Sequence, residues 1–171
     1  MIREYGPIAL IPSAWLMTFA TMIYPSLDVY WIQHMHYFML VFLTGFTIFS
    51  WKEMGENPVL DVWRNVIGAG ILFTSFGALS FHTTSYMNLL AGLSLGYWLL
   101  APGIGCYFSA KEMTSYKESY KRVGFSGIIS AILVSTVILT GSNIVVSLGF
   151  ALAAISQTYS ILIAAKLDEN L

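Results

Sequence analysis

Three histidines are the side chains of this sequence best suited to chemistry, and two of them stand one residue apart. His34 and His36 lie in the stretch YWIQHMHYF at 30–38, and His82 follows a second apolar stretch. Imidazole binds zinc, copper and haem iron, and the carboxylate of Asp28 can complete a metal shell. Residues at i and i+2 point about 200° apart on a helix, so His34 and His36 cannot chelate one ion together. A site must pair one of them with His82.

Three interpretations of the histidines stay open. The first is a zinc or copper site, or a protonation sensor, that combines His34 or His36 with His82 and Asp28. The second is haem b, held between imidazoles of two helices, with small residues for its faces at Gly45, Gly70 and Gly77. The third, which we favour, is an interfacial belt, in which aromatic bodies sit in lipid and polar tips reach water.

The composition indicates that lipid is the solvent of this chain. Of its 171 residues, 57% are hydrophobic and 10% are charged, and the mean hydropathy is +0.71. Soluble domains carry roughly 25% charged residues, so the chain lacks the charge to cover a soluble globule of its size. The net charge of −1 argues against a nucleic-acid partner. The single cysteine, Cys106, excludes an intrachain disulfide framework.

Six segments are long and apolar enough to cross a bilayer, whose core of about 30 Å needs about 20 residues per helix. They are 7–25, 29–51, 62–82, 86–109, 123–141 and 143–165. No convincing signal-peptide cleavage site follows the first, so we interpret it as a transmembrane helix. The sequence TGSN at 140–143 predicts a turn between the last two. The predicted fold class is an all-α integral membrane protein, with residues 1–171 forming one transmembrane domain.

The distribution of charge orients these helices. Three hairpins place every basic residue on one side of the membrane: Arg3, Lys52, Arg64, Lys111, Lys117, Lys121, Arg122 and Lys166. The other side receives tight turns near 26–28, 83–85 and 141–142. The positive-inside rule therefore predicts cytoplasmic N- and C-termini in the plasma membrane. The loop at 109–122 is basic enough to attract anionic lipid, but we interpret it as a topology signal with solvated charges.

The fourth segment carries residues that predict a helix contact and a helix break. Gly92 and Gly96 have the GxxxG spacing of close helix pairs. Pro102, followed by Gly103 and Gly105, removes a backbone donor and predicts a kink or break. A carbonyl freed at membrane depth lines a cavity or is bonded by a neighbouring helix. The break is therefore a candidate for a solute pathway.

Function is predicted from what the spans contain and lack. No Asp, Glu, Lys or Arg lies near the middle of a predicted span, which disfavours proton pumps and ion-coupled carriers. Ser156 and Gln157 are able to bond a neighbouring helix. The first hypothesis is a small channel or transporter for a neutral or weakly polar solute, with its pathway near Pro102 and the Gly92–Gly96 face. The alternatives are a haem- or metal-binding protein for electron transfer or sensing, and a packing subunit of a larger membrane complex. Small-residue faces favour a homo-oligomer, and no catalytic residue is predicted.

Overall fold

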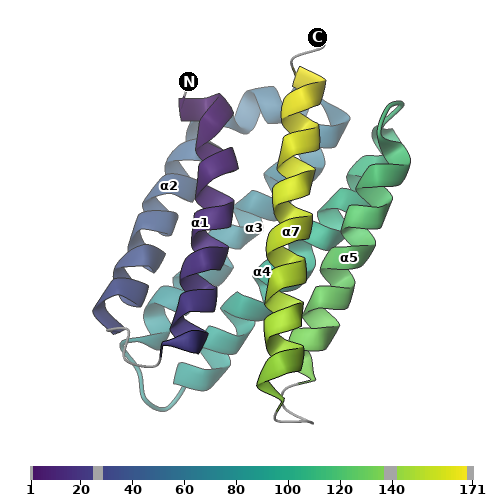
Figure 1. Ribbon diagram of the computed structural model, residues 1–171. Helices are drawn as coiled ribbons and strands as arrows, with labels where there is room; N and C mark the ends of the chain where they lie inside the picture. The colour runs from purple at the N-terminus through teal and green to yellow at the C-terminus, as the bar shows by residue number, and fades with distance from the viewer. Residues whose placement is uncertain (1, 25–28, 137–141, 169–171) are drawn as a thin grey trace.

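The computed structural model describes residues 2–24, 29–136 and 142–168, which form six α-helices and no strands (Figure 1). The helices are α1 (Ile2–Ile23), α2 (Val29–Glu56), α3 (Pro58–Ser80), α4 (Met87–Glu112), α5 (Lys117–Ser135) and α7 (Asn143–Asp168). Four of them, α2, α3, α4 and α7, are long and apolar enough to cross a membrane. Helix α5 is outside that set because four of its first six residues are charged. The predicted all-helical class is confirmed.

The helices form a ring in which most spatial neighbours are also neighbours in sequence. Helix α2 packs on α3, α3 on α4, α4 on α5 and α5 on α7, while α1 packs on α7 and closes the ring (Figure 1). Helix α4 also touches α7 across the ring. The contact between α1 and α2 is sparse although a short connection joins them. The ring therefore has a weak seam between α1 and α2.

Charge separates the two ends of the bundle. Figure 1 shows both chain ends at one end, together with the α2–α3 and α4–α5 junctions. This end, which we call the charged end, holds every Lys and Arg whose side chain the structure describes: Lys52, Arg64, Lys111, Lys117, Lys121, Arg122 and Lys166. The opposite end carries His34, His36 and His82. The turn predicted at 26–28 and the first half of the turn at 140–143 lie outside the described residues.

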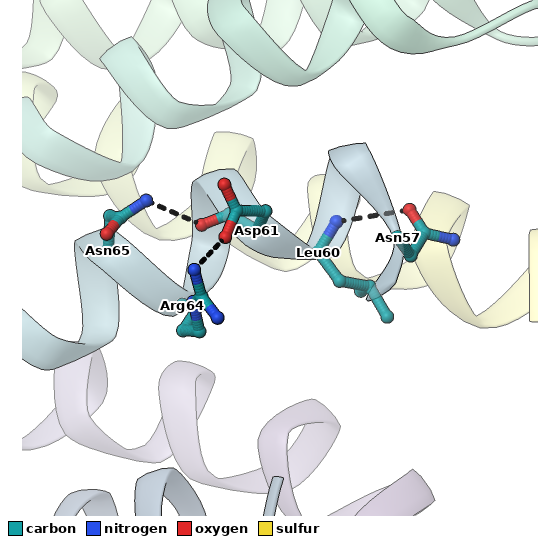
Figure 2. Close-up of polar contacts among 5 residues, drawn as sticks. All are labelled: Asn57, Leu60, Asp61, Arg64 and Asn65. Carbon is teal, nitrogen blue, oxygen red and sulfur yellow. Dashed lines mark hydrogen bonds and ion pairs between the residues drawn. The ribbon is translucent and has the colours of Figure 1, made fainter. Parts of the chain in front are cut away.

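The predicted spans 29–51 and 62–82 leave a loop at 52–61 between them, and the α2–α3 junction differs from that loop. Helix α2 runs through most of this stretch, and Asn57 alone separates it from α3. The Asn57 side chain accepts hydrogen bonds from the backbone N–H groups of Val59 at 2.9 Å and of Leu60 at 3.3 Å, and Figure 2 shows the bond from Leu60. A proline follows at the first helical position, where its missing N–H costs nothing. The predicted loop is wrong because charged residues in water do not end a helix. The helix is interrupted only at Asn57, which caps the start of α3.

An ion pair stabilises the first turn of α3. Arg64 pairs with Asp61 one helical turn away, and the Asn65 amide donates to the Asp61 carbonyl at 2.9 Å (Figure 2). The Arg64 guanidinium also lies 4.8 Å from the centre of the Trp51 ring on α2. This cation–π contact links the two helices beside their one-residue junction. The charged end is therefore organised by local contacts between α2 and α3.

Helices α4 and α5 approach to backbone contact at three glycines. A Cβ on Gly103 would lie 2.9 Å from the Gly124 carbonyl oxygen, and one on Gly127 would lie 3.1 Å from the Gly103 Cα. Such approaches need small residues at the contact. By contrast, a Cβ on Gly92 or Gly96 would meet nothing within 4 Å. Within the ring, the Gly92–Gly96 face of α4 therefore has no helix packed against it, and a close contact of this face with another copy of the chain stays a prediction.

Candidate functional site: a polar network at Pro102

Helix α4 continues without interruption through Pro102. The proline lacks an N–H group, so the Trp98 carbonyl four residues earlier loses its partner within the helix. The Gln157 side chain of α7 supplies the missing donor, with its Nε2 2.9 Å from the Trp98 oxygen. The helix break predicted at Pro102 is thus reduced to one freed carbonyl, and an amide from another helix bonds it.

The oxygen of the same Gln157 side-chain amide is bonded by a residue of α1. Its Oε1 accepts a hydrogen bond of 2.9 Å from the Trp15 indole Nε1. Both side chains are 6% exposed, so these bonds form where water does not compete with them. The Trp15 ring also lies 5.8 Å, centroid to centroid, from Phe150 of α7. Gln157 therefore joins the first, fourth and last helices of the ring.

Trp98 extends the chain of hydrogen bonds to α3. Its indole Nε1 donates to the Thr74 hydroxyl at 2.9 Å, and that hydroxyl donates to the Gly70 carbonyl at 2.8 Å. A Cβ on Gly70 would lie 2.7 Å from the Trp98 ring, so a side chain there would displace the indole. Trp15, Thr74, Trp98 and Gln157, which we call the central polar network, connect four helices without an ionisable group.

The other glycines predicted near the break have packing roles. Gly103 is at the backbone contact with α5, and a Cβ on Gly105 would lie 3.1 Å from Val66 of α3. Gly92 and Gly96 lie on the outer face of α4, away from these contacts. Of the residues expected along a pathway, the structure therefore brings Pro102 alone into the central polar network, through the carbonyl that it frees.

The structure places His34 and His36 on different faces of α2, as helix geometry predicted. The His36 Nδ1 lies 2.8 Å from the Ile32 carbonyl, and its ring edge fills the space above Gly77 of α3. His34 is exposed, with its Nδ1 2.7 Å from the Tyr30 carbonyl. One imidazole thus faces α3, while the other lies on the outer surface of α2.

His82 contacts α2 through residues other than the two histidines. Its Nε2 lies 2.6 Å from the Tyr37 hydroxyl and 3.1 Å from the Gln33 amide nitrogen. The Gln33 amide also donates to the Tyr37 hydroxyl at 2.8 Å. We call Gln33, His34, His36, Tyr37 and His82 the histidine rim, in which His34 and His82 are exposed and the other three are half-buried.

The geometry of the histidine rim bears on both cofactor hypotheses. Among the described side chains, no group of three or more His, Cys, Asp or Glu residues is placed to hold a metal ion, and Asp28 lies outside the described residues. For haem, Gly77 is covered by His36 at the α2–α3 contact and Gly70 by Trp98 of α4, whereas a Cβ on Gly45 would meet nothing within 4 Å. Side chains therefore fill the space at two of the three glycines expected to face a haem.

The central polar network was only partly visible in the sequence. Pro102 pointed to a freed carbonyl, and Gln157 was identified as able to bond a neighbouring helix. Trp15 and Thr74 had no such signal, because no local sequence pattern shows that α1 packs beside α7. Comparisons with protein-family models, with curated proteins and with solved structures give no match. The function is therefore argued from the geometry alone.

Proposed function

We propose that the chain is an integral membrane protein whose six helices all cross the bilayer, with both ends on the cytoplasmic side. Large apolar side chains face outward along the bundle, among them Phe49 at 84%, Val41 at 75% and Ile144 at 74% exposed. A soluble protein rarely exposes apolar area on this scale, whereas lipid solvates it. Clustering of the described Lys and Arg side chains at one end supports the orientation.

Within that frame we infer that the protein passes a neutral, weakly polar solute across the membrane. The observation that carries this proposal is the central polar network itself, a buried and uncharged set of donors and acceptors shared by four helices. A solute hydroxyl or amide can replace each of these bonds without moving a charge into lipid. An ion would find no such compensation among them.

The packing of α1 supplies the element that can move. Helix α1 packs on α7 and only sparsely on α2, and the Trp15–Gln157 bond ties it to the network. Breaking this bond leaves the Gln157 amide oxygen open to a solute, while the apolar packing of Trp15 on α7 keeps α1 in the ring. Such a hydrogen bond between membrane helices is worth about 0.6 kcal/mol on average, so a solute can compete for it.

Solute flux into proteoliposomes tests the proposal. Stopped-flow light scattering would compare glycerol and urea permeability in vesicles with the wild type, Gln157→Leu, Gln33→Leu and no protein. We expect the wild type to exceed protein-free vesicles, Gln157→Leu to lose most of that excess, and Gln33→Leu, at the histidine rim, to retain it. Wild-type permeability equal to that of empty vesicles would overturn the proposal.

A further inference from the structure

An open groove of about 260 Å³ runs between α5 and α7 near the charged end. Ser119 and Arg122 contribute to it from the start of α5, and Tyr159 contributes from the facing part of α7. Deeper in the bundle its lining is mostly apolar, with Val123, Leu152 and Ile155, and also includes Ser126 and Ser156. The groove is therefore basic at one end and mainly apolar, with two serine hydroxyls, along the rest of its length.

The polar end of the groove carries excess positive charge. Lys117, Lys121 and Arg122 lie within the first six residues of α5. Glu118 is their one acidic neighbour in this turn, and it is paired with Lys121 at 2.8 Å. The hydrogen bond and charge of Lys121 lower the pKa of Glu118, so this carboxylate is ionised at neutral pH and offsets one of the three cations.

The start of α5 adds a second source of positive potential. Tyr116 precedes the helix with φ of 57°, and no side chain caps the first turn. The unpaired N–H groups of an uncapped first turn carry partial positive charge. Ser119, which lines the groove, is in that turn. The Arg122 guanidinium has no acidic partner among the described ion pairs.

We propose that this groove binds one anionic phospholipid. Its phosphate lies at Arg122 and Ser119, with the Tyr159 hydroxyl at the same level, and an acyl chain follows Val123 and Leu152 into the membrane. The proposal rests on membrane insertion of the chain but is independent of solute transport. A second open groove, between α1 and α7, is lined by Phe19, Ile144, Ser147, Leu148 and Ala151. It carries no charge, so it has nothing to select a headgroup.

Lipid titration of the purified full chain in neutral detergent, followed by native mass spectrometry, tests the assignment. Phosphatidylglycerol is the anionic probe and phosphatidylcholine of the same chains is the zwitterionic one. We expect the wild type to prefer phosphatidylglycerol, and Arg122→Gln to weaken its binding about fivefold, the effect of about one basic residue near an anionic surface. Lys52→Gln is the matched control, because it removes one exposed charge at the same end but outside the groove.

A second variant tests the apolar part of the groove. Ser126 is half-buried and also lines the groove. In Ser126→Trp the indole ring fills the path of the acyl chain without changing the charge. We expect this variant to lose phosphatidylglycerol binding, and millimolar inorganic phosphate to leave wild-type binding unchanged. Equal losses in Arg122→Gln and Lys52→Gln would overturn the proposal in favour of general attraction to the basic end. Displacement of the lipid by phosphate would overturn it in favour of a simple anion site.

Discussion

The chain has two glutamines, and the side-chain amide of each links distant parts of the chain, in different surroundings. Gln157 is 6% exposed and bonds the Trp15 indole and the Trp98 carbonyl. Gln33 is at the histidine rim, where its amide reaches Tyr37 and His82. Water can replace every bond that Gln33 makes, but it cannot reach the partners of Gln157. We therefore expect Gln157 to contribute more than Gln33 to the free energy of unfolding, and variants at the two sites measure that difference.

The largest effect is expected from Gln157→Leu. It leaves the Trp15 indole and the Trp98 carbonyl without partners in a buried place, and we expect a loss of about 2 kcal/mol in the free energy of unfolding. Unfolding by sodium dodecyl sulfate in mixed micelles, followed by circular dichroism, measures it. Gln33→Leu is the matched control and should cost less than about 0.5 kcal/mol. Equal losses in the two variants would contradict the comparison.

Pro102→Ala tests how much the freed Trp98 carbonyl contributes to the free energy of unfolding. Alanine restores an N–H group four residues after Trp98, so the carbonyl regains a partner within α4. In the Gln157→Leu background we expect this change to recover about 1 kcal/mol of unfolding free energy. With Gln157 present the gain should be smaller, because the carbonyl is already bonded. A double-mutant cycle measures the coupling, and a coupling of zero would show that Gln157 does not act through this carbonyl.

These two variants also show what could be predicted from the sequence. The helical class and the opposite directions of His34 and His36 follow from hydropathy and helix geometry, which are local. The partners of Gln157 depend on α1 lying beside α7, and no local pattern encodes that. The contact predicted at Gly92 and Gly96 is absent within the ring for a related reason. Spacing identifies a small-residue face, but the ring decides whether a helix covers it, and here α5 meets Gly103 instead.

Trp15→Phe isolates the hydrogen bond that ties α1 to α7. Phenylalanine keeps the ring beside Phe150 but removes the indole N–H that bonds Gln157. We expect the free energy of unfolding to fall by about 0.6 kcal/mol. Relative to the wild type, hydrogen exchange measured by mass spectrometry should become faster in α1 and change less in α4. Faster exchange spread evenly over all six helices would mean that the bond does not hold α1 in particular.

The smallest effect is expected from His82→Ala, which decides how the histidine rim is used. Its contacts to Tyr37 and Gln33 are exposed, so their loss should change the unfolding free energy by less than about 0.5 kcal/mol. Because His36 faces Gly77 and His34 faces outward, the three imidazoles do not converge on one point. We therefore expect the wild type and His82→Ala to contain equal, substoichiometric zinc and copper by elemental analysis, without a Soret band in either absorption spectrum. Stoichiometric metal lost in the variant would instead make the rim a binding site, because removing an imidazole ligand weakens metal binding far more than removing an exposed partner of a tyrosine weakens the fold.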